Sequence, residues 1–227
     1  MSPSKPSIVF AHGLWADGSC YSKLIPTLQR EGHEVVSAQN SLDSLEGDVD
    51  AVHRALARVN SPAILVGHSW GGCVITAAGT DDRVAGLVYI AALGPDAGEN
   101  PQELIGKFEA PPLFSRLDTE DDRIWISRDG ISDFCGDLPK EDQKLVWATQ
   151  GAPRTAVLGA TIDNPAWKSK PSWFLVTTQD RAVNPEPQRF AAQRMGATVA
   201  EVDSAHIPML SQPDAVLDLI RTAARSV

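Results

Sequence analysis

Short apolar runs alternate with segments of helical periodicity along most of this chain of 227 residues. Apolar runs bounded by polar or turn residues are typical of strands that are buried in a parallel sheet. Their alternation with helical segments predicts an α/β fold in which helices cover the sheet. We expect a mostly parallel sheet of about six strands, formed by residues 8–11, 34–38, 63–66, 85–92, 173–178 and 197–202.

Two of the helical segments carry a clear apolar stripe. The later one spans residues 216–223 after Pro213, and we expect this last helix at the other edge of the sheet. Both stripes are core positions, because their spacing of three or four residues places the apolar side chains on one helix face. The earlier stripe consists of Leu45, Val49, Val52, Leu56 and Val59.

The alternation is interrupted between residues 96 and 172, where proline, glycine and acidic residues separate short helical stretches. We therefore expect one domain, with an α/β core at residues 1–95 and 173–227 and a helical cap insertion at 96–172. An insertion after a strand lies near the carboxyl edge of the sheet, where ligands bind in open α/β folds. Six of the twelve tryptophans and phenylalanines fall in the insertion, where they form either a binding pocket or a small core of their own.

Composition excludes several classes of partner. The net charge of −9 and the isoelectric point near 5.0 argue against nucleic acid and anionic membranes, since no basic patch is available. No stretch approaches the roughly 20 apolar residues that span a bilayer. Cys20, Cys73 and Cys135 are odd in number and widely separated, which favours a reducing compartment and a cytoplasmic protein. The first apolar stretch is too short for a signal peptide.

The run Gly67-His68-Ser69-Trp70-Gly71 carries the strongest chemical signal in the chain. It lies between an apolar run that predicts a strand and a segment at 73–78 that predicts a helix, so Ser69 falls on the bend between them. Gly67 and Gly71 lack side chains where strand and helix must pack closely. This geometry exposes the serine hydroxyl beside the first helical N–H groups, which suits a nucleophile and its developing oxyanion.

Together with His12-Gly13-Leu14-Trp15 and the late Asp180 and His206, this motif resembles the α/β-hydrolase superfamily over nearly the whole chain. The segment 204–210 is similar to that of the small methylesterase and hydroxynitrile-lyase branch of carboxylesterases. The resemblance implies a catalytic triad of Ser69, Asp180 and His206, in that order along the chain.

Two other carboxylates are alternatives for the acid of the triad. Asp96 follows the strand predicted at 85–92 and lies at the position that some lipases of this fold use. Asp203 is only three residues from His206, too close along the chain to face the imidazole easily. We favour Asp180, because its loop matches the family pattern and because it stands 26 residues before His206, enough for one helix and one strand.

The resemblance also implies an oxyanion hole made of the backbone N–H groups of Leu14 and Trp70. The bulk of these side chains and of Trp15 could shape a substrate pocket, although Trp15 is equally well explained as a packing residue. The substrate pocket that we expect consists of Trp15, Phe108, Trp125, Phe134, Trp147 and Ile207.

These expectations predict a serine carboxylesterase that cleaves a small to medium apolar ester or lactone through an acyl-enzyme. No metal-ligand spacing and no dinucleotide fingerprint occurs, so we expect no cofactor. A lyase, a cofactor-independent oxygenase and a non-catalytic receptor remain alternatives on the same scaffold. The hydroxynitrile lyases that the chain resembles have threonine and lysine where this chain has Gly13 and Ile207, which favours hydrolysis over cyanohydrin cleavage.

Overall fold

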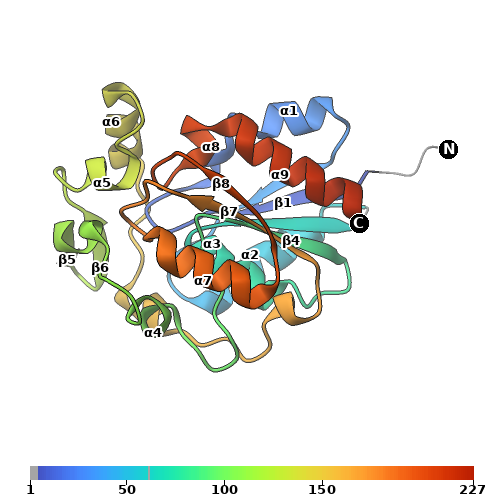
Figure 1. Cartoon of the computed structure of the whole chain (residues 1–227), viewed down its shortest axis with the longest axis horizontal. Coiled ribbons are helices and arrows are strands. Elements are labelled where there is room, and N and C mark those ends of the chain that lie inside the picture. Colours follow the sequence, from blue (N-terminus) through green and yellow to red (C-terminus); the bar gives the residue numbers. More distant parts are fainter. Residues whose placement is uncertain (1–4, 61) are drawn as a thin grey trace.

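The computed structural model describes residues 5–60 and 62–227, and its centre is a six-stranded sheet (Figure 1). All five strand pairings in this sheet are parallel, in the order β2-β1-β3-β4-β7-β8. The strands are β1 (Ser7–Ala11), β2 (Val35–Ala38), β3 (Ala63–His68), β4 (Val84–Ile90), β7 (Ser172–Thr177) and β8 (Thr198–Val202). The expected α/β-hydrolase sheet is confirmed, with strand ends within two residues of the expected positions.

Burial explains why the sequence marks these strands so clearly. Every residue of β1, β3 and β7 is buried, because helices cover both faces of the sheet and neighbouring strands cover both edges. The outer strands β2 and β8 are only partly buried, so their sequences are more polar.

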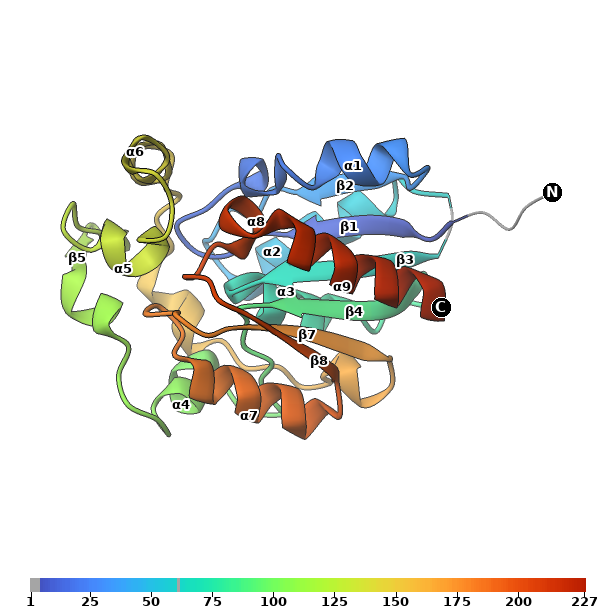
Figure 2. The same ribbon diagram turned by 45° about the horizontal axis from the view of Figure 1, so that its top comes forward.

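Helices occupy both faces of the sheet (Figure 1). On one face lie α1 (Ile25–Arg30), the short α8 (Pro208–Ser211) and α9 (Pro213–Ser226), and on the other lie α2 (Leu45–Leu56), α3 (Trp70–Ala78) and α7 (Pro185–Met195). The expected position of α9 at an edge is wrong: Figure 2 shows it crossing the sheet, and it packs on the inner strands β4 and β7. Its stripe of Val216, Leu219, Ile220 and Ala223 is buried there, a contact that an outer strand is too narrow to provide.

Most of the insertion lies beyond the carboxyl ends of the strands (Figure 2), but its last residues return to the opposite end, where the Nζ of Lys170 donates to the Val84 carbonyl at the start of β4. Its helices are α4 (Pro101–Ile105), α5 (Ile131–Cys135) and α6 (Lys140–Ala148), with 3-10 turns η2 (Pro112–Arg116), η3 (Thr155–Gly159) and η4 (Ala166–Lys168). No helix among the described residues is long and apolar enough to cross a membrane.

Besides the helices of the expected cap, the insertion contains a hairpin that the sequence does not predict. Strands β5 (Leu117–Glu120) and β6 (Arg123–Ile126) pair antiparallel around a two-residue turn. The turn residues Asp121 and Asp122 both have positive φ, 49° and 62°, as a type I′ turn requires. Asp-Asp is a weaker turn signal than Asn-Gly or Asp-Gly, and the strands are only four residues long.

Candidate active site

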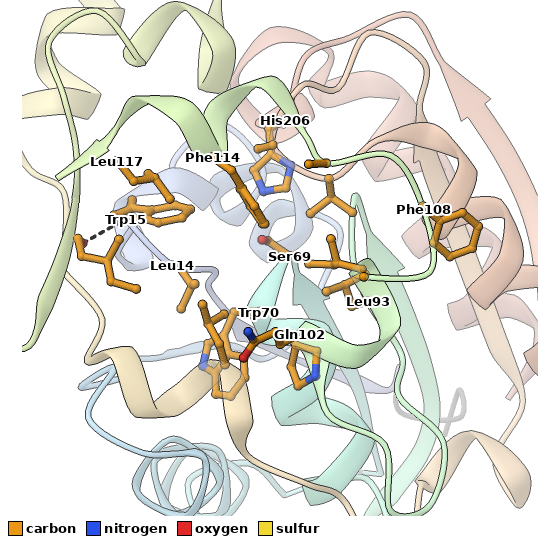
Figure 3. A pocket seen from close by; sticks show the side chains of 18 of the residues that line it. Leu14, Trp15, Ser69, Trp70, Leu93, Gln102, Phe108, Phe114, Leu117 and His206 are labelled. Atoms are coloured by element: carbon orange, nitrogen blue, oxygen red, sulfur yellow. Dashed lines mark hydrogen bonds between the residues drawn. The ribbon is translucent and has the colours of Figure 1, made fainter. Parts of the chain in front are cut away.

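Ser69 lies between β3 and α3 with a strained backbone, at φ 54° and ψ −119°. A residue other than glycine rarely adopts this conformation, and such strain is concentrated at functional sites. Ser69 is 7% exposed, and its side chain opens into a cavity at the carboxyl edge of the sheet. In Figure 3 the hydroxyl lies at the centre of this cavity and faces the ring of His206.

The flanking glycines make this bend possible. A Cβ on Gly67 would lie 2.4 Å from the carbonyl oxygen of Gly71, and a Cβ on Gly71 would lie 2.0 Å from that of Ala11. Real Cβ atoms essentially never approach backbone so closely. Strand β3, helix α3 and the end of β1 therefore meet at a distance that only glycine permits.

His206 follows β8, and its ring is paired with Asp180, which follows β7. The Nδ1 of His206 lies 2.7 Å from the Oδ2 of Asp180, and both side chains are almost completely buried. The same carboxylate accepts hydrogen bonds from the backbone amides of Ala182 and Val183 at 2.8 and 2.9 Å. The carboxylate is thus held by its own loop and oriented toward one imidazole nitrogen, so that Nε2 is left to face the cavity.

The contacts of the two alternative carboxylates, Asp96 and Asp203, differ from those of Asp180. Asp96 forms an ion pair with Lys168 at 2.5 Å, and this contact lowers the pKa of Asp96. Asp203 is exposed and accepts a hydrogen bond from the Thr178 hydroxyl at 3.4 Å. Among the described residues, Asp180 is the carboxylate that contacts His206.

Two further histidines brace the loops of the site. The Nε2 of His12 accepts a hydrogen bond from the Asn40 amide, and its Nδ1 lies 2.9 Å from the Gly13 carbonyl oxygen. The Nε2 of His68 donates to the His206 carbonyl at 2.7 Å. Burial lowers the pKa of His12 and lowers that of His68 well below its ordinary value, so both rings stay neutral.

Two backbone amides of residues that line the cavity have no backbone acceptor in the part of the chain that the structure describes. Trp70 is the first residue of α3, so its N–H has no acceptor within the helix. The amide of Leu14 bonds to no carbonyl oxygen in residues 5–60 and 62–227. Both residues line the cavity that holds Ser69. A carboxylate fixes the Trp70 side chain, because the indole Nε1 donates to the buried Asp48 at 2.8 Å.

The cavity has a volume of about 660 Å³ and a mainly apolar wall. Apart from the indoles of Trp15 and Trp70, the polar side chains among its described lining residues are those of Ser69, Gln102, Thr155 and His206. No aspartate, glutamate, lysine or arginine is among these lining residues. The cap supplies most of this wall, which consists of Leu14, Trp15, Trp70, Leu93, Pro101, Ile105, Gly106, Phe108, Ala110, Phe114, Leu117, Ile124, Leu158, Ala182 and Val183.

Two of the six residues expected in the substrate pocket line this cavity, namely Trp15 and Phe108. The Nε1 of Trp15 donates to the Ile124 carbonyl of β6, so this side chain both lines the cavity and anchors the cap (Figure 3). The structure places the other four elsewhere: Trp125 is 40% exposed on the hairpin, and Trp147 packs against Arg128.

Phe134 and Ile207 lie behind the cavity wall. Phe134 is fully buried against the His206 ring, and Ile207 faces a separate cleft beside α6. The lining residues that the sequence did not reveal, such as Ile105 and Leu158, are ordinary aliphatic residues. Their only signal is their position in the insertion, because aliphatic residues there are equally typical of a small core.

No group of three or more histidine, cysteine, aspartate or glutamate side chains in the described part of the chain could hold a metal ion. The three cysteines are free and buried, and burial raises the pKa of each thiol. They are therefore poor nucleophiles, and none of the three lines the cavity that holds Ser69.

Comparison with known proteins agrees with this geometry. The model of the alpha/beta hydrolase family matches residues 8–219. The chain belongs to the α/β-hydrolase family. This α/β-hydrolase is 27% identical to the alpha/beta hydrolase nvfD of Aspergillus novofumigatus, over 97% of both chains. It is 31% identical to a carbendazim hydrolyzing esterase of Nocardioides, over 49% of this chain and 52% of the relative.

The fold is also that of a solved esterase. The crystal structure of polyneuridine aldehyde esterase has a TM-score of 0.84 with this α/β-hydrolase, at 18% identity, over 96% of this chain and 99% of the other. This similarity extends to the cap as well as the sheet, since nearly all of each chain is covered.

Proposed function

We propose that this α/β-hydrolase is a serine carboxylesterase that cleaves a neutral, largely apolar carboxylic ester or lactone through an acyl-enzyme. One observation carries the proposal: His206, whose Nδ1 lies 2.7 Å from the buried Asp180 carboxylate, lines the same apolar cavity as Ser69 on its strained bend. A nucleophile, a base and a group that orients the base are the parts that such chemistry needs.

In the first half of the reaction, the Oγ of Ser69 attacks the ester carbonyl carbon while its proton passes to the Nε2 of His206. Asp180 accepts the hydrogen bond from Nδ1–H and stabilises the imidazolium. The carbonyl oxygen becomes an oxyanion held by the amides of Leu14 and Trp70. His206 then gives its proton to the departing alcohol, and the acyl group stays on Ser69.

In the second half, water takes the place of the alcohol. His206 removes a proton from this water as it attacks the acyl carbonyl, and the same two amides again hold the oxyanion. The proton returns to the Oγ of Ser69 as the carboxylic acid is released. Apart from the ester and this water, every group that these steps use belongs to the chain.

The cavity wall supports the choice of substrate class. A charged substrate entering an apolar cavity loses hydration that no lysine, arginine or carboxylate of the described lining replaces. Neutral esters avoid this cost, and their apolar parts gain about 25 cal/mol for each Å² removed from water. The name of the Nocardioides relative also supports hydrolysis.

Intact-mass labelling with a fluorophosphonate, followed by p-nitrophenyl esters of increasing chain length, tests the proposal. We expect one adduct on Ser69 and turnover of neutral esters. The Ser69→Ala variant should lose both, whereas Ser115→Ala, which changes an exposed serine of η2, should lose neither. Absence of the adduct, or unchanged turnover by Ser69→Ala, contradicts the proposal, as does cyanide release from mandelonitrile that is faster than ester turnover.

A further inference from the structure

One short segment of the cap, α5 and the two residues that follow it, contacts the loop that carries His206. The backbone N–H of His206 donates to the carbonyl of Phe134 at 3.2 Å. The Phe134 ring is fully buried, and its centroid lies 5.1 Å from that of the His206 ring. The cap therefore contacts both the backbone and the imidazole of the proposed base.

Asp137 holds the two residues immediately before His206. Its Oδ2 accepts hydrogen bonds from the Ala205 amide and from the Ser204 hydroxyl, both at 2.9 Å. Ser204 and Ala205 are buried, whereas Asp137 itself is exposed. Hydrogen bonds to an ionised acceptor are about twice as strong as those between neutral groups.

The core holds the His206 backbone from the opposite side. The Nε2 of His68, next to the nucleophile, donates to the His206 carbonyl at 2.7 Å, and the two rings lie 4.8 Å apart. The backbone of His206 is thus fixed at its N–H by the cap and at its carbonyl by the β3 turn. The contact to Asp180 fixes one ring nitrogen, but the tilt of the ring also depends on its packing against Phe134.

In the part of the chain that the structure describes, the hydrogen bond between the same cap segment and the loop of Asp180 is exposed. Asp133 pairs with Arg181 at 2.6 Å, but the arginine side chain is 57% exposed, and exposed ion pairs contribute little. The stronger contacts of α5 are those made to the loop of His206.

From these contacts we infer that Phe134 and Asp137 are positioning residues for His206, so that the cap is part of the catalytic apparatus as well as a wall of the cavity. This role rests on the proposed function, in which His206 transfers the Ser69 proton. Proton transfer and attack tolerate little displacement, and a shift of about 1 Å can cost about 100-fold in rate. Neither residue lines the cavity with Ser69, so their loss should affect the reaction step rather than substrate binding.

The variants Asp137→Ala, Asp137→Asn and Phe134→Leu test this role by steady-state kinetics with a p-nitrophenyl ester. For Asp137→Ala we expect kcat to fall on the order of 10- to 100-fold while KM changes little. Asn keeps an acceptor oxygen, so Asp137→Asn should recover most of the loss. Phe134→Leu keeps the backbone carbonyl and apolar bulk but loses the ring, and it too should lower kcat rather than raise KM.

The control is Asp129→Ala, which removes an exposed carboxylate from the same part of the cap and should leave both constants unchanged. Hydrogen exchange of the peptide that contains residues 204–207 gives a readout that does not depend on activity, and exchange should be faster in Asp137→Ala than in Asp129→Ala. A raised KM at unchanged kcat, equal losses in the control, or no rescue by Asn overturns the role.

Labelling of wild-type Ser69 by a fluorophosphonate separates this inference from the proposed function. An unlabelled wild type overturns the proposed function and the positioning role with it. A labelled wild type whose kcat survives both Asp137→Ala and Phe134→Leu overturns the positioning role alone.

Discussion

Replacing Asp180 by asparagine tests the proposed triad most sharply, because the structure specifies how the new amide must sit. The Oδ1 of Asp180 accepts hydrogen bonds from the backbone amides of Ala182 and Val183, which can only donate. The asparagine oxygen must therefore take this place, and its NH₂ group must take the place of Oδ2. At that position the NH₂ group faces the Nδ1 of His206 at about the present 2.7 Å.

A donor at this position reverses the tautomer of the imidazole. Nδ1 becomes the acceptor, the proton moves to Nε2, and Nε2 is no longer able to take the Ser69 proton. We expect kcat to fall by about 10³- to 10⁴-fold, which corresponds to about 4 to 5.5 kcal/mol at about 1.36 kcal/mol for each factor of ten.

The same substitution should destabilise the fold moderately. The Nε2 of Gln188 donates to Oδ2 at 2.9 Å, and the glutamine is held in this orientation because its Oε1 accepts from the Thr177 amide. The NH₂ group of the new asparagine and the Nε2 of Gln188 would then be two donors that face each other in a buried site. The Nε2 of Gln188 keeps its hydrogen bond to the Val183 carbonyl. A lost buried partner costs about 1–3 kcal/mol in the free energy of unfolding.

Steady-state turnover of a p-nitrophenyl ester and thermal unfolding followed by circular dichroism are the two assays. The control is Asp203→Asn, which changes an exposed carboxylate in the same loop as His206 and should retain activity and melting temperature. A folded Asp180→Asn protein that keeps kcat within tenfold of the wild type would refute the tautomer argument.

Two further predictions concern stability. Gly71→Ala should lower the free energy of unfolding by at least about 3 kcal/mol and abolish activity, because its Cβ would lie 2.0 Å from the Ala11 carbonyl oxygen. The control is Gly159→Ala, which has open space at its Cβ and should leave the free energy of unfolding, measured by urea denaturation, unchanged. Burial raises the pKa of Asp48 above its ordinary value of 3.8, so the folded protein binds this proton more tightly than the unfolded chain does. The contribution of this proton to the free energy of unfolding is complete below pH 3.8 and is lost as the pH rises through the higher pKa of the folded state. Unfolding of wild type and Asp48→Asn from pH 4 to 7 should therefore show the wild type gaining relative stability toward acid, and a difference that does not vary with pH contradicts this.

The sheet could be predicted from the sequence because burial on both faces leaves each inner strand as a continuous apolar run. The proposed triad came from the resemblance to the α/β-hydrolase family, and Ser69, Asp180 and His206 each follow a strand of one parallel sheet. The β5–β6 hairpin was missed because its strands are only four residues long and its turn contains no glycine. The contact of α9 with β4 and β7 was also missed, because an apolar stripe shows that a helix packs but not on which strands.

The cavity wall could not be predicted, and the reason lies in how the insertion folds. Its elements are short, and no periodicity distinguishes a residue such as Leu158, which faces the cavity, from Phe134, which faces His206. The aromatic content of the insertion predicts Phe134 as a pocket residue, but its ring packs against the ring of His206 instead.

Substrate preference and the proposed triad depend on different parts of the chain. The proposed triad side chains stand on loops of the sheet, whereas most of the cavity wall stands on the cap. Substitutions at cap residues that only line the cavity, such as Phe108, should therefore change KM between esters and leave the geometry of Ser69 and His206 intact. The segment from Phe134 to Asp137 is the exception, because it carries no wall residue and yet holds the backbone of His206. A cap exchanged between relatives without a compatible α5 should cost kcat even where the new cavity fits its ester.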